Sequence, residues 1–281
     1  MNGQVKPNKK HKTFEKFLKR ILIEIPLSKV GKFLIRKTNK EDLKSLIRSL
    51  HPIECEFPLI RFGPNTDGGY LIPNDLDGIE ACFSPGVSQV SGFEKDCASH
   101  GIKVFLADNS VDNPAEQDEL FDFTKKFIGS FSNENFTTIE DWVNTSLPQN
   151  HSDLILQMDI ESFEYETILS FPEELMKRFR IIVIEFHQLK QLHNSSFFFI
   201  ANRAFQKILN HHKCVHIHPN NIANTSYIDS VEIIDTMEFT FLRRDRIKNE
   251  EKFAKNFPHP LDFDNSLIKP SKDLPKNWFR S

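Results

Sequence analysis

The sequence of 281 residues predicts an α/β protein in which a mostly parallel sheet carries helices on both faces. Three continuous aliphatic runs, at residues 153–158, 180–186 and 213–218, support this prediction. Strands without polar alternation are buried on both faces, as they are in parallel sheets. A helix is expected directly after the first run. Apolar residues also recur at helical spacing over 197–209, between the second and third runs.

Each of these predicted strands ends in polar residues. Residues two apart on a strand share a face, so each strand offers a same-side pair, namely Asp159/Glu161, Glu185/His187 and His216/His218. Ligands of parallel sheets bind outside the carboxyl ends of the strands. His216 is expected in the core, because its strand is buried. The candidate catalytic residues are therefore Asp159, Glu161, Glu185, His187 and His218.

Residues 59–73 predict a β-hairpin. Two short apolar runs flank a bend made by Asp67, Gly68 and Gly69, which is a typical hairpin signal. Asp67 is either a turn-stabilising side chain or, together with Arg61, a polar contact to a ligand.

A glycine-containing loop and a later acid suggest a nucleoside site. A strand ending at Phe83 leads into the loop at 84–88, and the next strand spans 102–108. Glycine in such a loop lets a ligand approach the backbone, and an acid about 20 residues later is placed to bind ribose hydroxyls. Gly86 and Asp108 fit this spacing. The complete G-x-G-x-x-G pattern is missing, so we do not expect a phosphate-binding dinucleotide loop.

The composition is that of an ordinary globular protein, with 39% apolar and 27% charged residues. The four cysteines form no close pair in the sequence, which favours reduced thiols over disulfides or a zinc site. No apolar run reaches the length of a membrane span, and Lys19, Arg20 and Glu24 interrupt the apolar stretch near the start. These features predict a cytoplasmic protein.

The first 50 residues are strongly basic, with 14 Lys and Arg against 4 Asp and Glu, although the whole chain has a net charge of -3. Apolar residues at helical spacing, from Phe14 to Leu22, accompany the basic ones. Two interpretations remain open: a helix packed on the domain with solvated lysines, or a basic amphipathic helix on an anionic membrane. The second places residues 1–38 in peripheral contact with the inner face of a membrane. No nucleic-acid partner is expected, because the basic block has no run of interleaved glycines and no exposed aromatic platform.

The segment from Asp159 to Leu169 resembles the D-[IV]-E-G-x-E-x-x-x-L signature of the FkbM-type methyltransferases, except that Ser162 replaces the usual glycine. Further motifs in the same order extend the resemblance over residues 57–245, and they lie at 61–70, 84–88, 184–187, 216–221 and 238–243.

This resemblance implies the class I methyltransferase fold, a Rossmann-like seven-stranded sheet with helices on both faces. It also implies S-adenosylmethionine as the cofactor and a hydroxyl of a sugar, glycan or related small molecule as the acceptor. The segment 135–142 would lie near the adenine. The residues assigned to cofactor binding are Asp67, Gly68, Gly69, Tyr70, Ser84, Pro85, Gly86, Val87, Ser88, Asp108 and Asn109.

Methyl transfer to a hydroxyl requires removal of its proton, by a side-chain base or with a divalent cation that lowers the hydroxyl pKa. Carboxylates with one imidazole suit Mg2+ or Mn2+, and the expected ligands are Asp159, Glu185 and His218. Two other functions remain open on the same residues: a metal-dependent hydrolase or phosphatase, and a catalytically silent binding domain.

The chain is therefore expected to have three parts. Residues 1–56 form a basic helical N-terminal segment, and residues 57–249 form the FkbM-like domain. Residues 250–281 form a proline-rich tail that either wraps the domain or hangs loose.

Overall fold

A computed structural model describes residues 16–87, 90–148, 152–249 and 252–280. Contacts divide the chain into two units, residues 1–37 and 38–281, and each is described by itself. The large unit begins at Thr38, so the helix α3 (Lys40–Ser49) belongs to it. The leading unit is thus shorter than the segment 1–56 expected from the sequence, and the tail belongs to the large unit.

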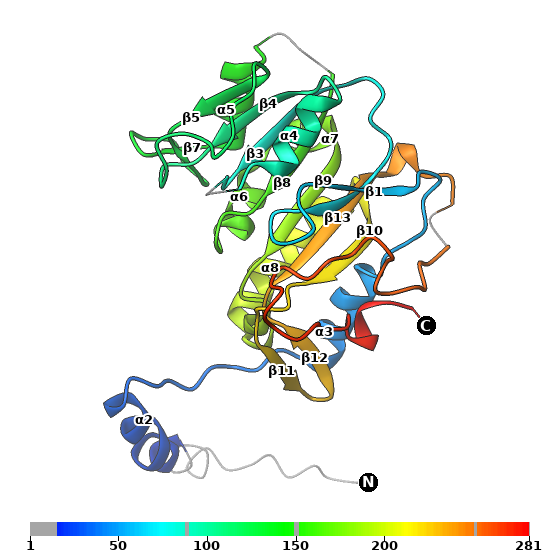
Figure 1. Cartoon of the computed structure of the whole chain (residues 1–281). Coiled ribbons are helices and arrows are strands. Elements are labelled where there is room, and N and C mark those ends of the chain that lie inside the picture. Colours follow the sequence, from blue (N-terminus) through cyan, green and yellow to red (C-terminus); the bar gives the residue numbers. More distant parts are fainter. Residues whose placement is uncertain (1–15, 88–89, 149–151, 250–251, 281) are drawn as a thin grey trace, which may run out of the picture. The chain divides into compact units, whose positions relative to one another are not determined.

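The centre of the large unit is a seven-stranded sheet in the order β10-β13-β9-β8-β3-β4-β5 (Figure 1). All strand pairs are parallel except those of β13, which is antiparallel to both neighbours. The prediction of a mostly parallel sheet is confirmed. The strands are β3 (Ile79–Pro85), β4 (Lys103–Ala107), β5 (Phe121–Thr124), β8 (Asp153–Met158), β9 (Phe179–Phe186), β10 (His212–Pro219) and β13 (Met237–Arg243).

The aliphatic runs form strands because each contributes to a core on both sides of the sheet. On β9, Ile182 and Ile184 belong to one core cluster, whereas Ile181 and Val183 belong to the other. The first cluster includes residues of α3 and four more helices: α5 (Ile139–Ser146), α6 (Glu164–Ser170), α7 (Glu173–Arg178) and α8 (Ser195–Leu209). The second includes residues of α4 (Gly92–Ser99) and of a hairpin.

That hairpin is the one expected from the sequence, with β1 (Leu59–Phe62) antiparallel to β2 (Tyr70–Pro73). Two further small sheets flank the main one, β6 (Phe127–Ile128) with β7 (Phe136–Thr137) and β11 (Thr225–Ile228) with β12 (Val231–Ile234). Short 3-10 helices complete the large unit, at η2 (Leu189–His193), η3 (Arg244–Arg246) and η4 (Lys276–Trp278).

The strand order creates one point where the chain reverses its direction across the sheet. From β3 the chain adds β4 and β5 on one side, and then continues with β8 and β9 on the other. Ligands of open α/β sheets bind at such a point, outside the carboxyl ends of the strands. The fold therefore directs attention to the ends of β3, β4 and β8.

The C-terminal tail wraps the large unit, which decides between the two alternatives for this segment. Trp278 in η4 is fully buried, and its indole nitrogen Nε1 donates to the carbonyl of Glu232 at 3.0 Å. The carbonyl of Asn277 lies 3.0 Å from His51 Nε2. The tail thus contributes to the same core as α3 and the sheet.

Within residues 16–37, the described part of the leading unit, a helical segment spans residues 16–29. Its centre is a π-helix, η1 (Arg20–Glu24), which continues into α2 (Ile25–Lys29). Pro26 lies in the first turn of α2, where its missing N–H is tolerated. Among the described residues, no helix has both the length and the apolar character needed to cross a membrane.

We expect Trp278→Ala to lower the free energy of unfolding by about 3–5 kcal/mol, because it removes a fully buried indole and leaves a cavity. Urea unfolding followed by circular dichroism measures this change. Lys276→Ala, at an exposed position of the same short helix, is the matched control and should stay within about 0.5 kcal/mol of the parent. Equal stability of the two variants would contradict the tail's role in the fold.

Candidate functional site

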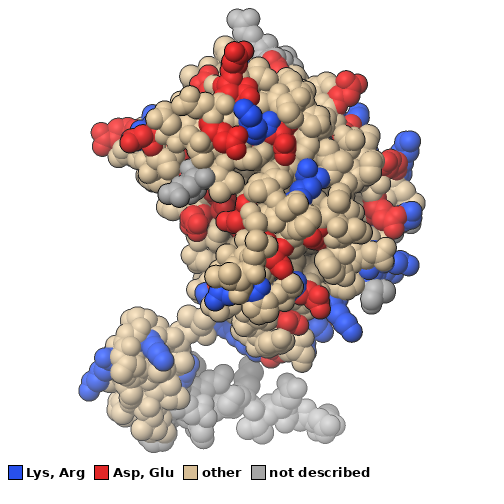
Figure 2. Space-filling model, viewed as in Figure 1, with Lys and Arg blue, Asp and Glu red and all other residues tan. Residues whose placement is uncertain are grey.

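A pocket of about 390 Å³ opens at the carboxyl ends of β3, β4 and β8. Its lining combines the polar residues Asp108, Ser110, Asp159 and Glu161 with apolar side chains such as Phe127, Ile128 and Phe136. Figure 2 shows acidic side chains gathered in the middle of the large unit, on the face drawn there. The lining residues are Gly86, Ala107, Asp108, Ser110, Phe127, Ile128, Phe136, Asp159, Ile160, Glu161 and Phe163.

Gly86 holds the two sides of this pocket close together. Its φ of +88° is in the left-handed region, and a Cβ atom there would lie 1.6 Å from the carbonyl oxygen of Asp159. Its N–H donates to the carbonyl of Ala107 at 2.9 Å. No side chain fits at this position unless the loop moves, so glycine is required by the packing of the protein itself.

Asp108 directly follows β4 and contributes to the pocket wall. Its Oδ1 accepts hydrogen bonds from the backbone N–H of Ser110 at 2.7 Å and from the Ser110 hydroxyl at 2.6 Å. These contacts orient the carboxylate. The predicted pairing of Gly86 with Asp108 in one site is therefore found in the structure.

Other residues assigned to the cofactor lie elsewhere. The hydroxyl of Ser84 is buried and contacts Glu94 and Gln157, and burial raises the pKa of Glu94 to about 7. Val87 belongs to the core on the α4 side. The segment from Asp67 to Tyr70 is in the hairpin, and neither it nor Pro85 or Asn109 lines the pocket. Ser88 lies outside the described residues.

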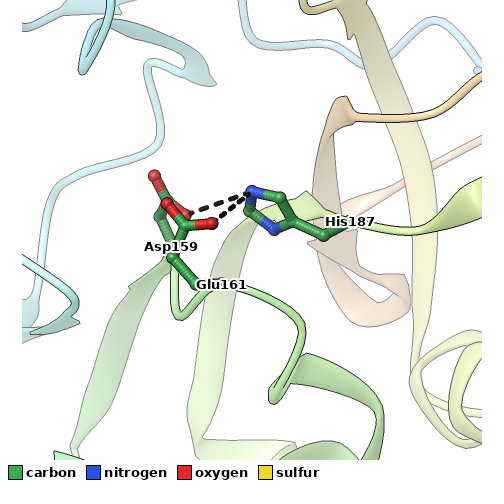
Figure 3. Close-up of side chains that lie close together, drawn as sticks. All are labelled: Asp159, Glu161 and His187. Atoms are coloured by element: carbon green, nitrogen blue, oxygen red, sulfur yellow. Dashed lines mark ion pairs between the residues drawn. The ribbon is translucent and has the colours of Figure 1, made fainter. Parts of the chain in front are cut away.

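Beside the pocket, the imidazole of His187 lies among four carboxylates. Figure 3 shows two of them, Asp159 and Glu161, facing the ring. Nδ1 is 2.9 Å from Glu164 Oε1. Nε2 is 3.5 Å from Glu161 Oε2, 3.8 Å from Glu185 Oε2 and 3.9 Å from Asp159 Oδ1. Three of the predicted catalytic acids therefore lie around His187, as expected from the strand ends.

These carboxylates control the charge of the histidine. Burial alone lowers the pKa of His187, but the hydrogen bond and charge of Glu164, with the charges of Glu185 and Glu161, outweigh burial and raise it to about 9. His187 is consequently protonated at neutral pH in the absence of another cation.

The pKa values of Asp159 and Glu185 are also raised, which in a carboxyl group favours the neutral form. Burial, followed by the charge of Glu185, raises the pKa of Asp159 well above its usual range. Burial also raises the pKa of Glu185, although Asn220 donates a hydrogen bond to its Oε1 at 2.7 Å. Asp159 Oδ1 is buried and has no hydrogen-bond partner within the described part of the chain. A proton or a cation bound between these carboxylates would stabilise them.

The turn between β8 and α6 is held in a strained conformation. Glu161 and Ser162 have φ angles of 51° and 88°, which are rare for residues other than glycine. The Ser162 hydroxyl accepts a hydrogen bond from Gln188 at 2.9 Å, and the Ser162 N–H donates to Glu164 at 2.9 Å. Glycine adopts a left-handed backbone without strain, which is a physical reason for the glycine that the FkbM-type signature has where this chain has Ser162.

His218 lies apart from this group. It is paired in register with Glu238, which is paired with Glu185, so β13 separates His218 from β9. Two strand spacings amount to about 10 Å. The expectation that His218 would join Asp159 and Glu185 in a metal site is therefore not supported by this placement.

A second polar cluster surrounds His218 instead. Its Nδ1 is 3.6 Å from Asp262 Oδ1, too long for a hydrogen bond, whereas His216 Nε2 is 2.8 Å from the same oxygen. Asn265 donates to Glu238 at 2.8 Å and to Asp67 at 3.0 Å. Burial raises the pKa of Glu238 to about 8. The tail thus supplies two polar residues to this edge of the sheet.

Sequence reasoning did not identify Glu164, Glu238, Asp262 or Asn265 as members of the site. Glu164 could have been found, because it belongs to the motif that begins at Asp159. Glu238 likewise begins the motif at 238–243, although its place beside Glu185 depends on the insertion of β13. Asp262 and Asn265 depend on the path of the tail, which leaves no local signal.

A divalent cation fits the first group better than the second. Ligand atoms of Asp159, Glu161 and His187 all lie within 4.8 Å of one another, with no rearrangement. His187 uses its other nitrogen to contact Glu164, and such a carboxylate contact is usual behind a metal-bound histidine. Asp159 Oδ1 is buried and has no hydrogen-bond partner among the described residues, so a cation there would satisfy it.

A comparison with protein-family models finds no match to this chain, and a comparison with curated proteins finds none either. The FkbM-type resemblance thus rests on the motif residues themselves.

We expect Glu164→Gln to lower the pKa of His187 from about 9 toward 6.5, because it removes the charge that most opposes burial. An NMR titration of the imidazole measures the shift. Glu166→Gln, an exposed acid on the same helix, is the control and should leave the titration unchanged. A His187 pKa that stays near 9 in Glu164→Gln would contradict the assignment.

Protonation of His187 makes the stability of the fold depend on pH. The folded-state pKa of about 9 exceeds the ordinary 6.5, so His187 contributes stability that is complete below about pH 6.5 and lost as pH rises through 9. Urea unfolding between pH 6 and 10 should show this fall, and His187→Gln should reduce its slope.

Proposed function

We propose that the protein is an S-adenosylmethionine-dependent methyltransferase that acts on a hydroxyl group. The observation that carries the proposal is the pocket at the strand-order reversal, where Gly86 and Asp108 lie on one wall and Asp159 lies beside them. A nucleoside cofactor of this type needs an acid for its ribose at the end of the second strand. Methyl transfer is a more specific proposal than the α/β fold, and the resemblance to the FkbM-type motifs supports it.

The pocket offers suitable groups for the ribose, the adenine and the sulfonium of the proposed cofactor. Asp108 would accept hydrogen bonds from the ribose hydroxyls, and Ile128 and Phe136 offer an apolar surface for the adenine. The positive sulfonium would lie toward Asp159 and Glu161, whose negative charges complement it. Trp142, by contrast, is buried in the core and does not line the pocket.

The residues beside the pocket can remove the acceptor proton. Protonated His187 cannot act as a base, so the Asp159–Glu185 pair is the better acceptor of that proton. Its raised pKa makes it more basic than an ordinary carboxylate. In the alternative state, a Mg2+ or Mn2+ ion would replace the proton on His187 Nε2. Asp159, Glu161 and His187 would hold this ion, and it would supply Lewis acidity that lowers the hydroxyl pKa.

The acceptor is proposed to be a sugar or a related polyhydroxylated molecule. Glu185 pairs with Glu238 across β9 and β13, and Asn265 joins Glu238 to Asp67, so three carboxyl groups at this edge of the sheet could exchange hydrogen bonds with hydroxyl groups. Burial raises the pKa of Glu185 and of Glu238, so these groups offer hydrogen bonds with little negative charge, which suits a neutral acceptor.

A metal-dependent hydrolase or phosphatase is the second candidate, because Asp159, Glu161 and His187 also suit a catalytic cation. Against a phosphatase, no Lys or Arg lies among the described residues that line the pocket, so a phosphate would meet acids without a fixed cation.

Cofactor binding tests the proposal at its first step. We expect calorimetry to detect S-adenosylmethionine binding to the full chain and Asp108→Ala to weaken it about 10-fold to 100-fold, because hydrogen bonds to a charged acceptor are lost. Asp122→Ala, an exposed acid on the neighbouring β5, is the matched control and should bind as the parent does. Failure of the parent protein to bind would overturn the proposal.

Catalysis tests the acids beside the pocket. We expect Asp159→Asn to abolish methyl transfer to a panel of glycans while it keeps most of the cofactor affinity, because the missing base serves the acceptor. Glu140→Gln, an exposed acid on α5, should transfer normally.

The cation requires a separate measurement. EDTA should inhibit transfer, and Mn2+ binding detected by electron paramagnetic resonance should be lost in Asp159→Asn and in His187→Gln. Full activity in EDTA would exclude a required cation and leave the carboxylate pair as the base.

A further inference from the structure

The leading unit exposes an unusual concentration of apolar side chains. Of the 22 large apolar side chains that are exposed in the described chain, ten lie within residues 17–35. Leu22 and Phe33 are 68% and 77% exposed. The ten are Phe17, Leu18, Ile21, Leu22, Ile23, Ile25, Val30, Phe33, Leu34 and Ile35. Water-exposed apolar patches of this kind mark surfaces that bind another protein or a membrane.

Basic side chains interleave with these apolar ones. In residues 16–37, Glu24 is the only acid in the sequence, against seven Lys and Arg. Figure 2 shows basic side chains on the surface of this unit. The seven are Lys16, Lys19, Arg20, Lys29, Lys32, Arg36 and Lys37. The partner must therefore accept apolar side chains and carry negative charge.

The spacing of the residues fits an orientation parallel to a surface. Phe17, Ile21 and Ile25 recur every four residues, with Leu18 and Leu22 beside them, which is the pattern of an amphipathic helix. The helical segment over 16–29 would be about 21 Å long, shorter than the roughly 30 Å apolar core of a bilayer. It can thus lie in the interface but cannot cross it.

The remainder of the protein lacks a net positive charge that would attract it to an anionic surface. The whole chain has 36 Lys and Arg against 39 Asp and Glu, while its first 50 residues have 14 against 4, so the remainder is acidic. Net charge therefore favours an approach to an anionic surface through the leading segment.

From these observations we infer that residues 16–37 bind the surface of an anionic lipid bilayer and attach the protein to it peripherally. The apolar side chains enter the interface between headgroups and acyl chains, and the Lys and Arg side chains contact lipid phosphates. The inference is independent of the proposed methyl transfer, because it uses no residue of the pocket.

Vesicle co-sedimentation of the full chain tests the inference. We expect binding to vesicles made of equal parts phosphatidylcholine and phosphatidylglycerol, and little binding to phosphatidylcholine alone. Raising the salt from about 0.1 M to about 1 M shortens the Debye length from about 10 Å to about 3 Å and should release most of the protein. Binding to both vesicles alike, or to neither, would overturn the inference.

Two variants separate the charge from the apolar contacts. Combined Lys16→Gln, Lys19→Gln and Arg20→Gln should lower the partition coefficient about 100-fold, because each basic residue contributes near an anionic surface. Ile21→Ser with Leu22→Ser should lower it about tenfold or more without altering net charge. The matched controls are Lys44→Gln with Arg48→Gln on α3, and Phe199→Ser with Ile200→Ser on α8, where the residues are also surface-accessible.

Light scattering distinguishes lipid binding from self-association, in which a second copy of this chain would cover the apolar side chains. A parent protein that is dimeric without lipid, and becomes monomeric in Ile21→Ser with Leu22→Ser, would show that the segment binds a second copy of this chain, and the lipid inference would fail. Unchanged unfolding by urea in all variants would confirm that any loss of binding does not come from misfolding.

Discussion

The approach of the Gly86 backbone to the carbonyl of Asp159 is the constraint on which the candidate site depends. It joins the loop after β3 to the chain after β8 at the point where the strand order reverses. Since a Cβ atom at Gly86 would overlap Asp159, the two strand ends can meet only with glycine there. This contact places Asp159 against the pocket wall that Asp108 also lines.

A second feature is electrostatic. Asp159, Glu185 and Glu164 are brought around His187 at the edge of a hydrophobic sheet, where isolated carboxylates are unfavourable. The protein meets this cost with a protonated imidazole, with the amide of Asn220 and with raised carboxyl pKa values. The strained turn at Glu161 and Ser162 maintains the arrangement, and such strain is common where geometry serves function.

The two ends of the chain have different relations to the sheet. The tail is packed into the core through Trp278 and brings Asp262 and Asn265 to the polar edge, so the large unit is incomplete without it. The leading unit instead keeps its apolar side chains exposed. One terminus therefore contributes to the fold and to the proposed acceptor side, whereas the other exposes the apolar and basic side chains from which we infer attachment to a lipid surface.

The sequence by itself determined the strands and the presence of polar residues at their ends. Strands buried on both faces must be continuously apolar, so 153–158 and 180–186 could be recognised locally, and Asp159 and His187 followed directly. Only the tertiary structure decided which polar residues meet. His187 joins Asp159, but His218 does not, because β13 is inserted between β9 and β10. Hydrophobic periodicity reports how a strand is buried and carries no information about which strand lies beside it.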